Sequence, residues 1–237
     1  MFSAAIFDLD GLLIDSERAF MEAWIAGARS VGVPLTAEQY AGVIGLADPE
    51  SYQALAALLG GAAVFAAVQA EVERRWAERA DPAEFALKAG ARELLARLRA
   101  AGVPCAVASS TGAADVRARL ARTGLLGHFD ALAGGDEVSR GKPDPAVYRL
   151  ALQRLGALPA ACLAFEDSAH GASAALDAGL QVVLVPDLRA PPPELAARSL
   201  RVLASLEEAV GWLPDWFATP LPSPGTGDDP APLRLNP

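Results

Sequence analysis

The hydrophobic pattern of the chain changes character after its first few residues. Residues 4–9 form a short apolar run that ends among acidic residues, as is typical of a buried parallel strand. From residue 16 to about residue 86, apolar positions recur at helical spacing and almost no segment has a strand pattern. Helices are predicted at residues 17–31, 36–44, 49–59 and 62–79.

Beyond residue 86, helical and strand patterns alternate. Helices are predicted at 90–101, 112–122, 144–155 and 168–178, and strands at 103–108, 129–132, 162–165 and 181–185. Alternation of this kind predicts an α/β fold, a doubly wound parallel sheet of Rossmann type with helices on both faces. The all-helical stretch would then be an insert that follows the first strand.

This pattern divides the chain into three predicted parts. Residues 1–15 and 87–218 would form the α/β core domain, and residues 16–86 would form an all-helical domain. Residues 219–237 are rich in proline and glycine, so an irregular tail is expected there.

Composition and charge exclude several classes of protein. The formal net charge is −9, so the surface would repel nucleic acid. The arginines at 92, 97, 99, 117, 119 and 122 are spread along amphipathic helices and are expected on solvated helix faces. No apolar run is long enough for a membrane span, and the first residues lack the pattern of a targeting segment, which favours a cytoplasmic protein. Cys105 and Cys162 lie in apolar runs and are expected to be buried core thiols.

Four polar clusters follow predicted strands or turns of the α/β part. They are residues 8–11 (Asp-Leu-Asp-Gly), 109–111 (Ser-Ser-Thr), 141–143 (Gly-Lys-Pro) and 166–168 (Glu-Asp-Ser). In open α/β sheets, ligands bind at the carboxyl ends of the strands, so these clusters are expected to meet at one edge of the sheet.

Crowded carboxylates repel one another, and a divalent cation relieves that repulsion. Ligand sets made only of oxygen, with room for water, suit Mg²⁺. A metal and Lys142 would neutralise an incoming phosphoryl group, and hydroxyls and amides near Ser109 and Ser110 would hold its other oxygens. A carboxylate can attack phosphorus to form an aspartyl-phosphate, while a second carboxyl two residues away exchanges the protons.

With these four motifs in order, the chain resembles the haloacid dehalogenase superfamily, in particular its phosphatases and β-phosphoglucomutase-like members with a helical cap after the first strand. The resemblance extends to about residue 212 and includes Asp15 and Ser16 after the first motif. It implies that Asp8 is the nucleophile and a metal ligand. It implies that Asp10 is the general acid and base and gives its backbone carbonyl to the metal.

The resemblance also implies roles for the remaining motif residues. Lys142 would pair with the phosphoryl group and Asp8, while Glu166 and Asp167 would hold the metal. The phosphate contacts would come from Gly11, which keeps its loop tight, from Ser109 and from the Ser110 amide. Thr111 and the cap residue Asp48 are further candidates for contacts with phosphate or substrate.

Each cluster taken alone also has a purely structural interpretation. Aspartates at strand ends form turns, and Ser109 or Ser168 before a helix is ordinary capping composition. Lys142 is harder to explain in this way, because 18 of the 20 basic residues are arginine, and a lysine at this position suggests a need for a compact ammonium. His128 and His170 are expected to be structural or exposed.

Two alternatives to a phosphatase remain open. Mutases of the superfamily carry a histidine where this chain has Phe20, and a phosphate-binding arginine in a cap loop that here reads Gly-Leu-Ala-Asp at 45–48. An aspartate in that place would repel a second phosphate, so a phosphatase is preferred to a β-phosphoglucomutase-type enzyme. The other alternative is a non-catalytic module that binds phosphate or metal.

The predicted partner is a small phosphorylated metabolite, such as a sugar or polyol phosphate, and neither nucleic acid nor membrane. A monomer is expected, with a dimer as the alternative.

Overall fold

The computed structural model describes residues 1–43, 48–78, 86–187 and 189–217, and the predicted tail therefore lies outside the described residues. The chain divides into two compact units, Met1–Ile14 with Leu87–Pro237, and Asp15–Ala86. Backbone hydrogen bonds join residues next to the two points where the chain passes from one unit to the other. Within the first unit, the amide of Lys88 donates to the carbonyl of Leu13 at 3.0 Å.

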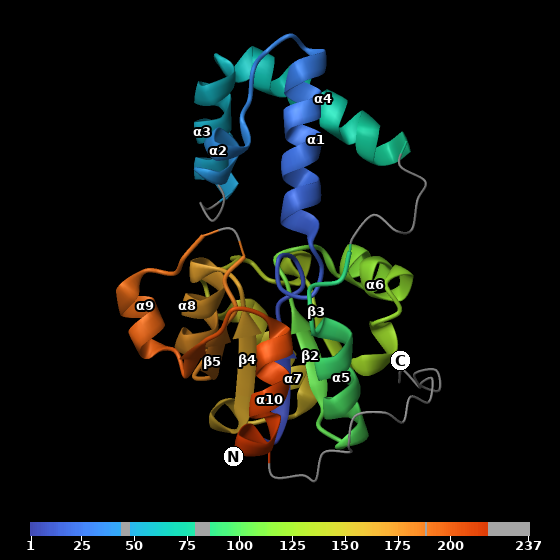
Figure 1. The fold of residues 1–237 in the computed structure, drawn as a ribbon, viewed down its shortest axis with the longest axis vertical. Helices are drawn as coiled ribbons and strands as arrows, with labels where there is room; N and C mark the ends of the chain where they lie inside the picture. The colour runs from blue at the N-terminus through green and yellow to red at the C-terminus, as the bar shows by residue number, and fades with distance from the viewer. Residues whose placement is uncertain (44–47, 79–85, 188, 218–237) are drawn as a thin grey trace. The chain divides into compact units, whose positions relative to one another are not determined.

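The first unit is built on a parallel sheet of six strands in the described chain, which confirms the predicted fold class (Figure 1). Its strand order is β3-β2-β1-β4-β5-β6, and every neighbouring pair is parallel. The strands are β1 (Ala4–Phe7), β2 (Cys105–Ala108), β3 (Ala131–Ala133), β4 (Cys162–Glu166), β5 (Gln181–Leu184) and β6 (Arg201–Val202). The order reverses between β1 and β4, and a crevice for ligands is expected at such a switch point.

Helices connect these strands. They are α5 (Ala91–Ala100), α6 (Ala113–Arg122), α7 (Ala146–Leu155), α8 (Ala169–Asp177), α9 (Pro193–Arg198) and α10 (Leu206–Trp216), with short 3-10 turns at Leu126–His128, Gly135–Glu137 and Pro159–Ala161. Elements predicted between residues 90 and 185 are all present, with ends shifted by at most two residues. The sequence patterns missed α9, β6 and α10, because α9 and β6 are very short and α10 contains Pro214.

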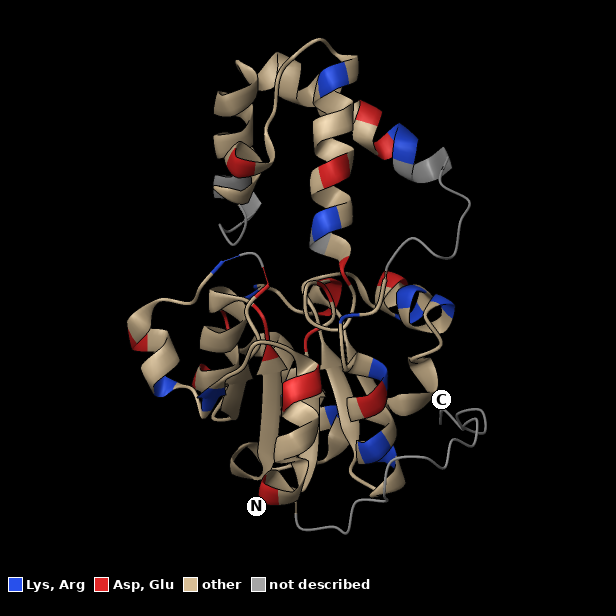
Figure 2. Cartoon of the chain, viewed as in Figure 1, with Lys and Arg blue, Asp and Glu red and all other residues tan. Residues whose placement is uncertain are grey.

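Apolar side chains pack on both faces of the sheet. On one face, side chains of α7, α8 and α9 form a buried cluster with strand residues such as Ile6, Ala164 and Val182. On the other face, Phe7 stacks on Phe165 with ring centroids 4.7 Å apart. Charged residues lie mostly on the outer helices and at the ends of the strands (Figure 2). Both cysteines are buried free thiols, as predicted.

The secondary structure of the second unit, among its described residues, consists of helices. Its helices are α1 (Ser16–Ser30), α2 (Ala37–Ala41), α3 (Asp48–Leu59) and α4 (Ala62–Glu78). It has its own apolar core, in which Trp24 stacks on Phe65 at 5.4 Å. Gly27 lets α1 approach α4 closely, because a Cβ there would lie 3.0 Å from a methyl group of Val72.

No single helix among the described residues is both long and apolar enough to cross a bilayer. The pair Tyr52–Leu59 and Ala62–Arg75 passes the same test only when the two helices are joined, and it is bent by 106° at its break.

Candidate active site

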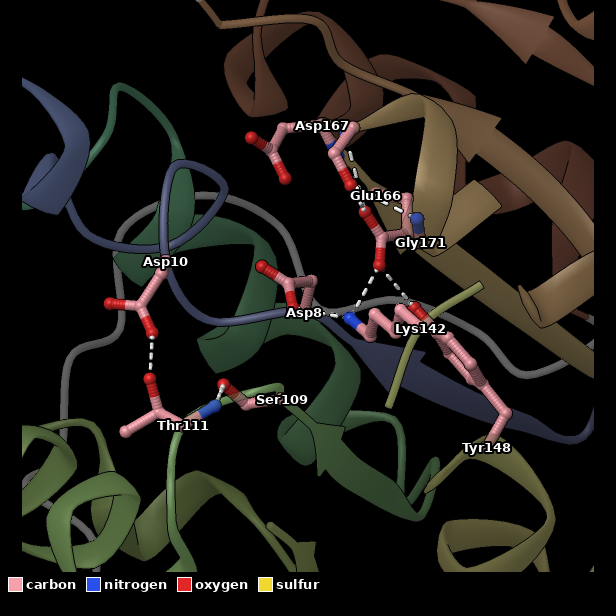
Figure 3. A network of polar contacts seen from close by, with 10 residues as sticks. Asp8, Asp10, Ser109, Thr111, Lys142, Tyr148, Glu166, Asp167 and Gly171 are labelled. Carbon is pink, nitrogen blue, oxygen red and sulfur yellow. Dashed lines mark hydrogen bonds and ion pairs between the residues drawn. The ribbon is translucent and has the colours of Figure 1, made fainter. Parts of the chain in front are cut away.

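The centre of the site is formed by the ends of two neighbouring strands. Phe7 of β1 is in register with Phe165 of β4, so Asp8 and Glu166 lie side by side at the carboxyl edge of the sheet. Asp8 is only 6% exposed and Glu166 is fully buried. The turn before α7 brings Lys142 between them, and its Nζ donates to Asp8 Oδ1 at 2.5 Å and to Glu166 Oε1 at 2.6 Å (Figure 3).

Lys142 is almost completely buried, with 5% of its side chain exposed. Burial alone lowers the pKa of a lysine, but the carboxylates of Asp8 and Glu166 outweigh it and raise the pKa of Lys142 above its usual value. The ammonium is therefore charged at neutral pH. The ring of Tyr148 lies beside this ammonium, with the ring centroid 5.0 Å from Nζ.

Three acids of this edge have the arrangement of a cation site. One ligand atom from each of Asp8, Glu166 and Asp167 lies within 4.8 Å of the others. Burial raises the pKa of Asp8 to about 8, with Lys142 opposing and the carboxylates of Glu166 and Asp10 adding to the rise. A divalent cation would offset this repulsion, and a donor set made only of oxygen suits a hard cation. The residues present therefore fit a metal such as Mg²⁺.

Glu166 is held at both ends of its carboxylate. Oε2 accepts the backbone amides of Asp167 and Ser168 at 3.1 and 3.2 Å, and the Ser168 hydroxyl at 3.2 Å. Oε1 accepts the Tyr148 hydroxyl at 2.6 Å as well as Lys142. Burial and the nearby carboxylates raise the pKa of Tyr148 well above its usual value, so this hydroxyl remains a donor.

The start of α8 is shaped to accommodate that carboxylate. Ser168 caps the helix by accepting the Gly171 amide at 3.1 Å, so its predicted capping role is confirmed. A Cβ on Gly171 would lie 1.8 Å from Oε1 of Glu166. Only glycine leaves room for the carboxylate at this position.

Asp10 has a different environment from the other acids. Its Oδ2 accepts the Thr111 hydroxyl at 2.7 Å and its Oδ1 accepts Arg119 at 2.5 Å. Of the four acids expected at the metal, Asp8, Glu166 and Asp167 bring carboxylate oxygens together, and the contribution expected from Asp10 was its backbone carbonyl. The expectation of a solvated helix face is wrong for Arg119, whose side chain is 17% exposed and which points to the site.

The loop that carries Asp10 is a tight turn. Gly11 has φ of 86°, a conformation that residues with a side chain rarely adopt. Its amide donates to the carbonyl of Ile14 at 2.9 Å. The turn places Asp10 beside the end of β2.

The end of β2 contributes hydroxyl groups. Ser109 is buried, and its Oγ accepts the amide of Thr111 at 3.1 Å. Ser110 is exposed, and its carbonyl packs against Gly135, where a Cβ would lie 2.1 Å from that oxygen. The structure thus brings Ser109 and Thr111 to the same edge as Asp8 and Asp10 (Figure 3).

The cap residues named from the sequence are not described. Residues 45–47 lie outside the described residues, and Asp48 begins α3 but its side chain is also outside them. The sequence patterns missed Tyr148 and Arg119. A signal existed for Tyr148, a polar hydroxyl inside an apolar stripe six residues after Lys142, but Arg119 gave none.

Comparison with known proteins identifies the type of protein. A family model described as haloacid dehalogenase-like hydrolase matches residues 2–179. A phosphorylated carbohydrates phosphatase of Thermotoga maritima is 34% identical over 180 residues, which cover 75% of this chain and 82% of that protein.

Solved structures agree with this match. A hydrolase of the same family from Deinococcus radiodurans, with bound phosphate and sodium, is 30% identical with a TM-score of 0.75, covering 91% of this chain and 96% of its own. A beta-phosphoglucomutase from Clostridium difficile has a TM-score of 0.70 and 19% identity, covering 91% of this chain and 97% of its own. At that identity the likeness is of the fold alone.

Proposed function

This chain belongs to the haloacid dehalogenase-like hydrolase family, and we propose that it is a magnesium-dependent phosphatase that acts through an aspartyl-phosphate on Asp8. The family and its relatives identify it as a phosphoric monoester hydrolase. The observation that carries the proposal is the buried Lys142 ammonium, 2.5 Å from Asp8 and next to the acids of a cation site.

In this reaction Asp8 is the nucleophile. Its carboxylate attacks the phosphorus of the substrate, a P–O bond to Asp8 forms, and the P–O bond to the alcohol breaks. Asp10 gives a proton to the departing alcohol oxygen and later takes one from water. That water attacks the aspartyl-phosphate, which releases inorganic phosphate and restores the Asp8 carboxylate.

Proton transfer by Asp10 requires a change of partners. In the structure its carboxylate accepts from Thr111 and Arg119. Both are donors to the ionised form of Asp10, the form that can later accept a proton from water. Asp10 must therefore take up a proton from solvent first, and the substrate oxygen must compete with these donors before Asp10 can protonate it.

The phosphoryl group would be bound by positive charge and by hydrogen-bond donors. Lys142 supplies the ammonium, and the hydroxyl of Ser109 and the amide of Ser110 would hold further oxygens. Thr111 and Gly11 border this part of the edge. Charge develops on the phosphoryl oxygens during transfer, so preorganised donors contribute most at that point.

The metal would be held by Asp8, Asp167 and Glu166, together with the backbone carbonyl of Asp10. When bound, Mg²⁺ neutralises phosphoryl oxygens and the carboxylates around them. The chain itself provides the oxygen donors and excludes most water from Asp8, which is 6% exposed.

The substrate is proposed to be a sugar or polyol phosphate. The named relative in Thermotoga maritima acts on phosphorylated carbohydrates, and this supports the choice of class. Residues 16–86 would serve as the cap that selects the substrate, moving on the linkers near residues 15–16 and 85–90. Asp48 remains our candidate for a substrate contact from that unit.

The decisive experiment is turnover of p-nitrophenyl phosphate by the purified chain, with Mg²⁺ and with EDTA. Phosphatase activity that requires the metal is the expected result. A folded protein with metal and no turnover above background would instead identify a binding module. A panel of phosphorylated metabolites then ranks substrates by kcat/KM.

A mutase is the second candidate, because a structure described as a putative beta-phosphoglucomutase from Thermotoga maritima is 30% identical and covers 92% of this chain. Incubation with β-glucose 1-phosphate and a trace of the bisphosphate separates the two. Release of free phosphate is expected. Glucose 6-phosphate as the main product would reject the phosphatase in favour of the mutase.

A further inference from the structure

Tyr148 connects the two charged groups at the centre of the site. It is fully buried in α7, and its hydroxyl donates to Oε1 of Glu166 at 2.6 Å. The same oxygen accepts Lys142 Nζ at 2.6 Å, and the tyrosine ring lies 5.0 Å from that nitrogen. One side chain therefore contacts both partners of the Lys142–Glu166 pair (Figure 3).

The Glu166 carboxylate has five donors in the structure. Three of them, from Asp167 and Ser168, bind Oε2, and the other two, from Lys142 and Tyr148, bind Oε1. These donors occupy both oxygens of the carboxylate, so a metal that takes Glu166 as a ligand would displace one of them. Such a group is fixed in position at both ends.

Tight packing against α8 limits the movement of the Glu166 carboxylate. Gly171 of α8 lies so close that an added Cβ would be 1.8 Å from Oε1 of Glu166. Tyr148 donates to this oxygen, and α8 packs against the carboxylate as a whole. Because Lys142 donates to the same oxygen, the position of Oε1 affects where the ammonium lies.

We propose that Tyr148 is a positioning residue of the active site: its hydroxyl holds Glu166 so that this carboxylate aligns Lys142 on Asp8. The proposal deepens the proposed phosphatase function and rests on it. Among the described residues, the Tyr148 hydroxyl has a hydrogen bond to Glu166 and none to Asp8. Its effect on catalysis would therefore pass through Glu166.

The test is a double-mutant cycle of Tyr148→Phe and Glu166→Gln, with turnover of p-nitrophenyl phosphate as the readout. Phenylalanine keeps the ring beside Lys142 and removes only the hydroxyl. Loss of a hydrogen bond to a charged group lowers kcat by about tenfold, and KM stays within about twofold because the hydroxyl does not touch substrate. In the Glu166→Gln background the loss shrinks to about threefold, because a hydrogen bond to a neutral amide is about half as strong.

Two outcomes would overturn the proposal. One is a Tyr148→Phe enzyme with the kcat of the unmodified chain. The other is a loss of the same size in both backgrounds, since a hydroxyl that only supports packing does not depend on the charge of Glu166. Tyr52→Phe, which removes an exposed hydroxyl from α3, is the control and should leave kcat unchanged.

The free energy of unfolding, measured for the same four proteins in EDTA, separates this proposal from the proposed function. If the unmodified chain shows no turnover, the phosphatase proposal fails. Coupling between Tyr148 and Glu166 in unfolding would then still show that the hydroxyl holds the carboxylate. Additive effects of the two substitutions on unfolding would overturn the positioning role without any assay of activity.

Discussion

Lys142 and Asp8 form a buried ion pair, with Nζ 2.5 Å from Oδ1 and 5% and 9% of the two side chains exposed. The two residues are 134 positions apart, and the pair exists because β1 and the turn before α7 meet at one edge of the sheet.

Asp8→Asn keeps the size of the side chain and removes the nucleophile. Turnover of p-nitrophenyl phosphate is expected to fall on the order of a thousandfold or more. Circular dichroism and a thermal melt check that the variant is folded. Asp215→Asn, at an exposed position of α10, is the matched control and should keep full activity. Substantial turnover by Asp8→Asn would remove Asp8 from the mechanism.

Lys142→Met leaves the carboxylates of Asp8 and Glu166 buried without their cation. In EDTA, the free energy of unfolding is expected to fall by about 3–5 kcal/mol, since removing one partner of a buried pair leaves an uncompensated charge. Urea unfolding measures the change. Lys142→Arg restores the charge with a larger planar group, so it should recover part of this loss. An unchanged midpoint for Lys142→Met would contradict the buried pair.

Mg²⁺ is expected to stabilise the chain through Asp167. At about a hundred times its dissociation constant, a ligand that binds only the folded state adds about 2.7 kcal/mol. The melting temperature should therefore rise with Mg²⁺, and Asp167→Asn should abolish most of that rise. Asp115→Asn, at an exposed position of α6, should retain it. An equal rise in all three proteins would place the cation elsewhere.

Gly171→Ala should disrupt the site, because its Cβ would lie 1.8 Å from Oε1 of the fully buried Glu166. Either Glu166 or α8 must shift, which we expect to cost about 1–3 kcal/mol in stability and at least tenfold in turnover. Gly211→Ala in α10 is the control, since no atom lies within 4 Å of an added Cβ there. It should raise stability by about 0.5–1 kcal/mol. Equal behaviour of the two variants would reject this account of Gly171.

The ion pair of Glu137 and Arg154 predicts a pH dependence of stability. The hydrogen bond from Arg154 lowers the pKa of Glu137 to about 2, from the ordinary value of 4.5. Its contribution is therefore complete above about pH 4.5 and is lost as the pH falls from there towards 2. The side chains are 29% and 37% exposed, so solvent limits the effect to at most about 1 kcal/mol.

Urea unfolding of the unmodified chain and of Glu137→Gln tests this dependence at about pH 6 and about pH 3. At the higher pH, the unmodified chain should have a larger free energy of unfolding than Glu137→Gln. This difference between the two proteins should shrink at the lower pH. A difference that grows on acidification would contradict the sign.

The order of the motifs made the family recognisable from the sequence. Alternating helix and strand periods predicted the parallel sheet, because buried strands and amphipathic helices have local signatures. The clusters at the strand ends follow from that topology. Elements without a clear period, such as the two-residue β6 and the short α9, left no such signature.

What the sequence determined by itself is which chemical groups stand at the ends of which strands. The tertiary structure decided how those groups pair. Asp10 contacts Arg119 from α6, and Glu166 contacts Tyr148 from α7. An arginine on an amphipathic helix has the same local pattern whether it faces water or a carboxylate. The partner comes from another segment of the chain, so only the packing of helices on the sheet can distinguish the two cases.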